Sequence, residues 1–135
     1  MTAEELLTKR FAALDSGDFV TVYGTYHQDA PFTQQFADRD VYVQFAQQQL
    51  SVIQVKSWKS LHQRQIDVEQ QEHLLVMELT VDGSSQYFYE LALLINTPDG
   101  WRYHSAQKLG VEDYSGLPEQ IEFAHFDQVA QKIRY

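Results

Sequence analysis

The sequence predicts an α+β fold in which an antiparallel sheet is covered by helices from the N-terminal part of the chain. The first observation is that residues 73–109 hold most of the unbroken apolar sequence, which two turn signals, Asp82-Gly83 and Pro98-Asp99-Gly100, divide into three strands. The second is that residues 2–49 carry apolar side chains at helical spacing. The third is that the middle strand is largely apolar on both faces, so each face needs a cover of helices or of a second copy of the sheet.

Composition and charge limit the classes of protein that the chain can belong to. Its 135 residues, of which 44% are hydrophobic, are enough for one domain with its own core. We expect residues 1–110 to form the α+β domain and residues 111–135 a helical tail of the same domain. The net charge of -9, with ten scattered Lys and Arg, disfavours a nucleic-acid partner.

Several kinds of site and location are also disfavoured. Without cysteine the chain has no disulfide, thiolate zinc site or cysteine nucleophile, and no dinucleotide or phosphate-binding motif occurs, so no cofactor is expected. The N-terminal sequence does not resemble a signal peptide and no segment reaches membrane-spanning length. These features predict a cytoplasmic protein without a membrane partner.

Three helices are predicted before the sheet. Thr2 and Glu5 fit a capping box for the first helix, which Ser16-Gly17 ends. Asp18 can cap a second, short helix that should close before Pro31. Asp38 or Asp40 can cap a third helix. The expected apolar positions are Leu6, Leu7, Phe11 and Leu14 on the first helix, Phe19, Val22, Tyr23 and Tyr26 on the second, and Val41, Tyr42, Phe45 and Gln49 on the third.

The remaining elements are a long first strand and a C-terminal tail. Residues 52–68 alternate weakly, which indicates one exposed side or a bulge. In the middle strand of the following meander, alternation places Tyr87, Tyr89, Leu91, Leu93 and Ile95 on one face and Phe88, Glu90, Ala92, Leu94 and Asn96 on the other. After Pro118, one helical face carries Phe123, Phe126, Ala130 and Ile133.

This order of helices and strands resembles that of the nuclear transport factor 2-like superfamily. Within it, the stretch KRFAALDSGDFVTVYGTYH, together with Trp58-Lys59-Ser60-Leu61 and the entry to the last strand at Asp99, is similar to the middle domain of YchJ-type SEC-C proteins. The resemblance covers roughly residues 6–109 and implies a strongly curved sheet that forms a cone around the helices, with ligands bound at its mouth. The cysteine-rich segments of that family are absent, so its zinc sites are not implied here.

Tyr26, His27 and Asp29 form the densest polar and aromatic cluster. A histidine beside a carboxylate can act as a general base, and a tyrosine hydroxyl can donate to a developing oxyanion. The structural alternative is that Tyr26 packs, His27 ends a helix and Asp29 caps the turn before Pro31. Both interpretations are compatible with the sequence.

Two carboxylates interrupt apolar strands. Glu78 and Glu90 could face into the cone as an acid or a base, because burial raises the pKa of a carboxyl group. Alternatively they could pair across strands with Lys59, Arg64, Arg102 or Lys108. The other four histidines lack metal-ligand spacing, so no metal site is predicted.

The sequence therefore predicts a domain that binds a small apolar or weakly polar ligand and forms a homodimer through the outer sheet face. The expected ligand-binding side chains are Tyr26, His27, Tyr42, Trp58, Tyr89, Trp101 and Tyr103. One alternative is an isomerase, cyclase or dehydratase that uses His27, Asp29 or Glu78 as the proton shuttle. Another is a protein-interaction module with a filled cone, recruited through the glutamines at residues 47–49.

Overall fold

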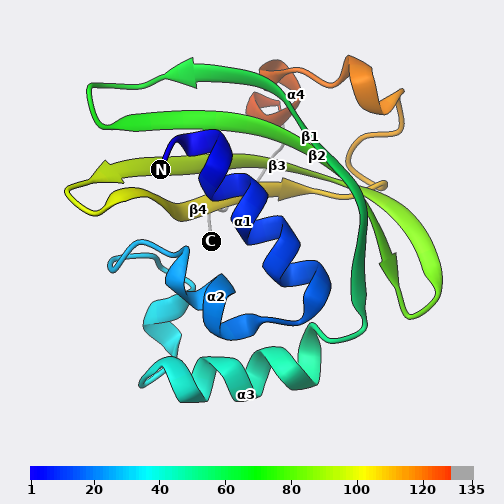
Figure 1. Ribbon diagram of the computed structural model, residues 1–135. Coiled ribbons are helices and arrows are strands. Elements are labelled where there is room, and N and C mark those ends of the chain that lie inside the picture. The colour runs from blue at the N-terminus through cyan, green and yellow to red at the C-terminus, as the bar shows by residue number, and fades with distance from the viewer. Residues whose placement is uncertain (129–135) are drawn as a thin grey trace.

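A computed structural model describes residues 1–128 of the chain. Its elements are α1 (Ala3–Ser16), α2 (Phe19–Gly24), α3 (Arg39–Gln49), β1 (Ile53–Gln65), β2 (Gln70–Val81), β3 (Ser84–Thr97), β4 (Gly100–Leu109) and α4 (Phe123–Asp127), with single 3-10 turns at Thr33–Gln35 and Pro118–Gln120. The strands form one antiparallel sheet in the order β1-β2-β3-β4, which curves around α1 (Figure 1). This confirms the predicted α+β fold with a curved antiparallel sheet and N-terminal helices.

The predicted caps fix the ends of α1. Thr2 Oγ1 accepts a hydrogen bond of 3.1 Å from the Glu5 backbone N–H, and the Glu5 carboxylate accepts one of 3.4 Å from the Thr2 N–H. At the other end Gly17 adopts a φ of 74°, a left-handed conformation that glycine tolerates at low cost. The helix thus lies with Leu6, Leu7 and Phe11 toward the sheet.

The second and third helices differ from the prediction in their extent and their faces. α2 ends at Gly24, before Tyr26, because Thr25 and His27 bond instead to β4: the Tyr103 N–H donates to the Thr25 carbonyl and the His27 N–H to the Tyr103 carbonyl, both at 2.8 Å. On α3 the predicted Tyr42 is buried, but the predicted Val41 and Gln49 are exposed, and Ala46, which was not predicted, is buried. The helix is therefore rotated relative to the predicted face.

Asp38, not Asp40, caps α3, since its carboxylate accepts a 3.0 Å hydrogen bond from the Val41 N–H. Asp38→Ala should lower the free energy of unfolding by about 1 kcal/mol, the usual value of such a cap. The matched control is Asp40→Ala, which removes an exposed carboxylate of the same first turn. Chemical denaturation of both variants measures the difference, and equal losses would contradict the assignment of the cap.

Both predicted turns are present, and the sheet also contains three irregularities. Asp82 and Gly83 have φ values of 52° and 83°, the positive values that the two central residues of a type I′ hairpin turn require. Shifts of register occur between Val55 and Ser57, between Ser60 and His62, and between Leu93 and Leu94. Such bulges increase the bend and twist of a strand, which suits a sheet that wraps around a helix.

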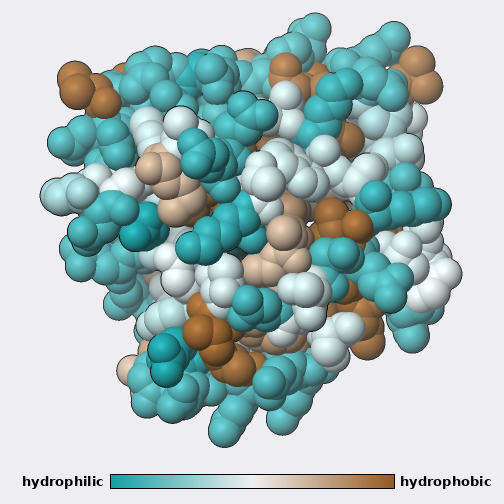
Figure 2. Space-filling model, viewed as in Figure 1, coloured by the Kyte–Doolittle hydropathy of each residue, from teal (hydrophilic) through white to brown (hydrophobic). Residues whose placement is uncertain are grey.

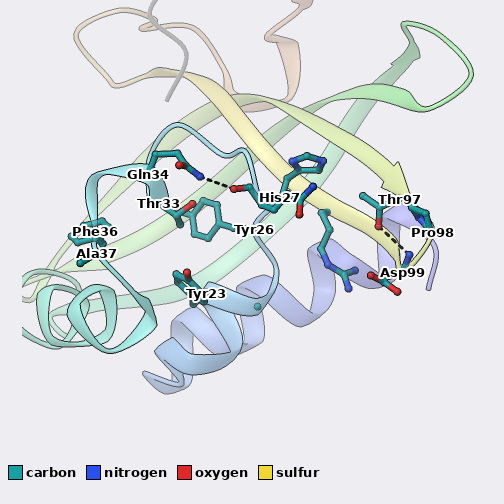
Figure 3. Close-up of a pocket in the computed structure, with 13 residues that line it drawn as sticks. Tyr23, Tyr26, His27, Thr33, Gln34, Phe36, Ala37, Thr97, Pro98 and Asp99 are labelled. Carbon is teal, nitrogen blue, oxygen red and sulfur yellow. Dashed lines mark hydrogen bonds between the residues drawn. The ribbon is translucent and has the colours of Figure 1, made fainter.

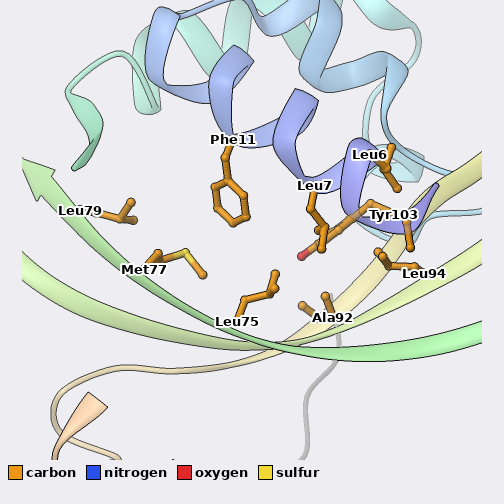
Figure 4. Packing of buried hydrophobic residues seen from close by; sticks show 11 residues of the cluster. Leu6, Leu7, Phe11, Leu75, Met77, Leu79, Ala92, Leu94 and Tyr103 are labelled. Atoms are coloured by element: carbon orange, nitrogen blue, oxygen red, sulfur yellow. The ribbon is translucent and has the colours of Figure 1, made fainter. Parts of the chain in front are cut away.

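The inner core lies between α1 and the concave face of the sheet (Figure 4). Leu7 is fully buried and Phe11 is 4% exposed, and both pack among side chains of β2 and β3. The sheet residues of this cluster are Leu75, Met77, Leu79, Ala92, Leu94, Tyr103 and Ala106. Trp58 completes one side, where its ring stacks on Phe11 with a centroid distance of 4.7 Å.

The C-terminal segment covers part of the outer face of the sheet. Ile121 and Phe126 are fully buried against outer side chains of β2 and β3, among them Leu74 and Leu91. The Gln107 side chain adds a 2.8 Å hydrogen bond to the Phe126 carbonyl. α4 spans only Phe123–Asp127, and the predicted Ala130 and Ile133 lie outside the described residues.

The first strand is shorter than predicted at its C-terminal end. β1 ends at Gln65, so Ile66 and Val68 lie in the following loop, where Val68 is 92% exposed.

On the face drawn in Figure 2, hydrophobic side chains are scattered among hydrophilic ones. Within residues 1–128 no helix is long and apolar enough to cross a membrane.

Candidate functional site

A cavity of about 350 Å³ lies inside the cone, bounded by the three N-terminal helices and the sheet. Its wall is mainly apolar and includes Phe11, Leu14, Val22, Phe32, Phe45, Leu50, Ile53, Met77, Leu79 and Phe88. The polar residues that reach it are Arg10, Tyr26, Tyr42, Glu90 and Lys108. A concave apolar space with a few convergent polar groups is the usual form of a small-molecule site, and we call it the inner cavity.

Arg10 lies in the wall of the inner cavity, and its guanidinium makes four contacts there. Its guanidinium donates hydrogen bonds of 2.9 Å to Thr25 Oγ1 and 3.1 Å to the Tyr26 hydroxyl. It also lies over two aromatic rings, 3.7 Å from the centroid of Tyr103 and 4.5 Å from that of Tyr26. Burial alone would lower the pKa of Arg10, but Tyr26, Tyr103 and Glu90 raise it above its ordinary value, so the group stays charged.

Glu90 lies opposite Lys108 in the β3–β4 register and reaches the same cavity. Its carboxylate accepts a 3.1 Å hydrogen bond from the hydroxyl of Tyr103, which is 1% exposed. Burial, followed by the charge of Glu90, raises the pKa of Tyr103 well above its usual value, so this phenol is a permanent donor near neutral pH. Glu90 is therefore held in position by a protonated tyrosine.

Two further tyrosines offer hydroxyl groups to the inner cavity. Burial raises the pKa of Tyr42, so its hydroxyl stays protonated near neutral pH. The Tyr26 hydroxyl accepts from Arg10, which leaves its own hydrogen to be donated elsewhere. The two rings lie 6.1 Å apart in an edge-on arrangement. The cavity can thus present two O–H donors beside a cation.

A second hollow, of about 530 Å³, lies at the mouth of the cone and is more polar (Figure 3). Tyr23, His27, Gln34 and Asp99 are among the side chains that line it. The Gln34 side chain donates a 2.6 Å hydrogen bond to the Gln28 carbonyl, which ties the loop after α2 together. We call this hollow the mouth groove. Of the residues that line it, Tyr26 also lines the inner cavity.

The structure separates the residues that the sequence analysis grouped around His27. His27 lines the mouth groove, and its Nδ1 accepts a 3.0 Å hydrogen bond from the backbone N–H of Asp29. The contact between these two residues therefore does not involve the Asp29 carboxylate. Neither His27 nor Asp29 lines the inner cavity, whereas Tyr26 and Tyr42 do.

Glu78 is not among the residues that line the inner cavity. Its carboxylate lies 3.7 Å from Lys56 Nζ on β1, a cross-strand ion pair with a partially exposed carboxylate. The sequence offered Lys59, Arg64, Arg102 and Lys108 as partners for Glu78 and Glu90 together. Lys108 lies opposite Glu90 in the register, whereas the ion pair of Glu78 is with Lys56, which lies at the bulge between Val55 and Ser57. Arg64 pairs instead with Glu72, at 2.8 Å.

The predicted aromatic ligand-binding residues have different surroundings. Tyr103 lies under Arg10 beside the cavity, while Trp58 packs on Phe11. Tyr89 borders the inner cavity, but its ring contacts Tyr114 of the C-terminal segment at a centroid distance of 5.2 Å, in the outer cluster. Trp101 lines a separate, open depression near the N-terminus.

Sequence reasoning missed Arg10 as a site residue, although a signal was present. Arg10 stands three residues after Leu7 and four before Leu14, so it falls on the apolar face of the helix. A charged residue on such a face must find partners, and here Thr25, Tyr26 and the ring of Tyr103 provide them. Among residues 1–128 there is no group of His, Asp and Glu suited to a metal ion.

Comparisons with known proteins place the fold. The chain resembles a ketosteroid isomerase-like protein from Erwinia carotovora atroseptica, with a TM-score of 0.61 and 14% identity over 80% of this chain and 92% of that one. It also resembles a domain of unknown function with a cystatin-like fold from Nostoc punctiforme, with a TM-score of 0.63 and 12% identity over 93% of this chain and 83% of that one.

A third solved structure is named as a candidate Ca/calmodulin-dependent kinase II association domain, from Exiguobacterium sibiricum. Its TM-score is 0.54, with 16% identity over 79% of this chain and 88% of that one. No family model and no curated protein matches the sequence. The fold is therefore that of the nuclear transport factor 2-like, cystatin-like cone. Together with the inner cavity, this fold defines the class of the protein as a cone domain with an internal cavity.

Proposed function

We propose that this domain binds a small, mostly apolar organic molecule in the inner cavity, with a hydrogen-bond-accepting oxygen directed at Tyr26, Tyr42 and Arg10. The single observation that carries the proposal is the coexistence of apolar walls with two tyrosine hydroxyl groups beside a charged guanidinium. A carbonyl or an acidic oxygen is the group that such donors recognise.

Charge supports an oxygen-bearing rather than a cationic ligand. The residues that line the inner cavity include two cations, Arg10 and Lys108, and one carboxylate, Glu90. The protein as a whole has a net charge of -9, so the cationic excess is local to the cavity. A ligand with a partial or full negative charge at one end fits this arrangement best.

An enzymatic role is the second candidate, and one observation favours it. Glu90 accepts a hydrogen bond from Tyr103 and reaches the same cavity as Tyr26 and Tyr42. A carboxylate base with tyrosine donors is suited to moving a proton next to a carbonyl group, as in isomerases and dehydratases. In this alternative Glu90 is the base, in place of His27, Asp29 or Glu78, which lie away from the cavity.

The interaction-module alternative requires a filled cone, and the volume of the inner cavity argues against it. A homodimer through the sheet stays a prediction. The reason for expecting this dimer was an outer sheet face without a cover, and that reason is weaker because Ile121 and Phe126 already cover part of the face. The narrower resemblance to YchJ-type domains also stays a prediction and supplies no ligand.

Binding can be tested with the apolar anionic dye anilinonaphthalene sulfonate. We expect its fluorescence to rise on binding to the folded protein and the affinity to fall at least tenfold in Leu50→Trp, because Leu50 lines the inner cavity and a larger ring would fill it. The matched control is Val52→Trp, since Val52 is 47% exposed. Equal affinities for both variants would place the dye elsewhere and contradict the proposal.

A further inference from the structure

A second arrangement of polar side chains lies on the β1–β2 pair, outside the inner cavity. His73 of β2 is 2% exposed, and each ring nitrogen has a partner. Its Nδ1 lies 3.2 Å from Ser60 Oγ on β1, and its Nε2 lies 3.0 Å from Gln71 Oε1 on β2. Ser60 itself is exposed. A buried histidine thus connects an accessible hydroxyl to an amide oxygen.

The backbone carbonyl of Asp67 sets the donor and acceptor roles in this series of hydrogen bonds. The Gln65 side-chain Nε2 donates to the Asp67 carbonyl oxygen, so Gln65 Oε1 faces Gln71 and accepts a 3.0 Å bond from its Nε2. Gln71 Oε1 must then accept from His73, whose Nε2 carries the proton. His73 Nδ1 is left unprotonated, and the Ser60 hydroxyl is the donor to it.

His73 is suited to act as a base near neutral pH. Burial lowers the pKa of its imidazole below the ordinary value, and the charge of Glu4 on α1 acts in the opposite direction. Glu4 and His62 are the other titratable groups that line the small hollow beside this ring. The neutral form of His73, with Nδ1 free to accept a proton, is therefore the resting form.

Ser60 opens into a hollow of about 180 Å³ between α1 and β1. Leu7 and Leu61 supply apolar lining, and the volume lies below the ~300–1,000 Å³ of ordinary ligand pockets, so only a short group fits. The register shift between Ser60 and His62 leaves Leu61 without a partner in β2.

We propose that Ser60 is a nucleophile, with His73 as its base, that accepts a short acyl group from an unhindered ester. Ser60 Oγ forms a bond to the acyl carbon as its proton moves to His73 Nδ1. The bond from that carbon to the ester oxygen breaks, and the alcohol leaves with the proton from His73. Water releases the acyl group by the same proton path. Gln71 is a positioning residue that fixes the tautomer of His73.

The test uses the full chain and p-nitrophenyl acetate. We expect release of nitrophenolate and one acetyl group on the peptide that contains Ser60, located by mass spectrometry. Ser60→Ala should abolish this adduct, and His73→Asn should slow its formation roughly a hundredfold, the scale of general-base catalysis. Ser57→Ala, at an exposed serine of the same strand, is the control that should react like the unmodified protein.

A pH profile separates proton transfer from a structural role. Acylation should fall as the pH drops and His73 becomes protonated, and Gln71→Glu should move this fall to higher pH because a carboxylate beside Nε2 favours the imidazolium. Absence of the Ser60 adduct in the unmodified protein would overturn the proposal. So would equal labelling of Ser60 in the folded His73→Asn variant. Neither outcome bears on the inner cavity, since the two sites share no residue.

Discussion

Replacing Leu75 with alanine should lower the free energy of unfolding by about 2–5 kcal/mol. Leu75 is fully buried at the centre of β2, in the inner cluster with Leu7 and Phe11 of α1 (Figure 4). Truncation removes apolar contacts and leaves a cavity that a curved sheet pressed against a helix cannot close easily. Urea unfolding monitored by circular dichroism measures the loss.

The matched control for Leu75→Ala is Val68→Ala in the loop between β1 and β2. Val68 is 92% exposed, so its truncation should change stability by less than about 0.5 kcal/mol. A small loss for both variants would mean that α1 does not pack on the concave face as described. The stability of the whole cone is expected to depend on this contact.

Arg10→Ala should lower stability by about 2–4 kcal/mol and weaken binding of the dye in the inner cavity. The change removes two charged hydrogen bonds, to Thr25 and Tyr26, and the contact with the face of the Tyr103 ring. It also leaves the Glu90 carboxylate without the nearby positive charge of Arg10. Dye affinity should fall because the cavity loses a cation.

Two variants separate these effects. Lys9→Ala removes a neighbouring but exposed cation of α1 and should leave both stability and dye affinity nearly unchanged. Arg10→Lys keeps the charge but cannot donate to Thr25 and Tyr26 from one planar group, so it should recover only part of the loss. Full recovery by lysine would show that charge alone, and not the hydrogen-bonded arrangement, accounts for the role of Arg10.

Local sequence signals were sufficient for the elements whose structure is locally determined. Thr2 and Glu5 form the predicted capping box, and Asp82-Gly83 forms the predicted hairpin turn. The alternation in β3 also placed Leu91 and Leu94 on opposite faces, and in the structure they belong to the outer and the inner cluster respectively. In each case the determining interaction joins residues that are close in the sequence.

Tertiary contacts decided what the sequence left open. The faces of β1 could not be read because register shifts between Val55 and Ser57 and between Ser60 and His62 interrupt its alternation. The end of α2 depends on hydrogen bonds to Tyr103, which lies more than seventy residues further along the chain. The weak alternation of residues 52–68 indicated one exposed side or a bulge but not the positions of the two shifts, and the end of α2 has no signature in its own segment.

The candidate site was predictable in kind but only partly in residues. Tyr26, Tyr42, Tyr89 and Tyr103 were named from the sequence, and all four lie at or beside the inner cavity. His27 and Asp29 were candidates because they are close in sequence. In the structure His27 lines the mouth groove, and neither residue lines the inner cavity. The cavity itself is assembled from distant elements, which spacing alone cannot show.

The methyl group of Met77 tests most directly whether the inner cavity binds small, mostly apolar molecules. The chain has two methionines: Met77 lines the cavity and is 3% exposed, whereas Met1 is 50% exposed. In an NMR titration of the methionine methyl groups with anilinonaphthalene sulfonate, we expect the Met77 signal to shift with the same saturation curve as the fluorescence, while the Met1 signal stays in place. Saturation of the fluorescence with an unchanged Met77 signal would contradict the claim.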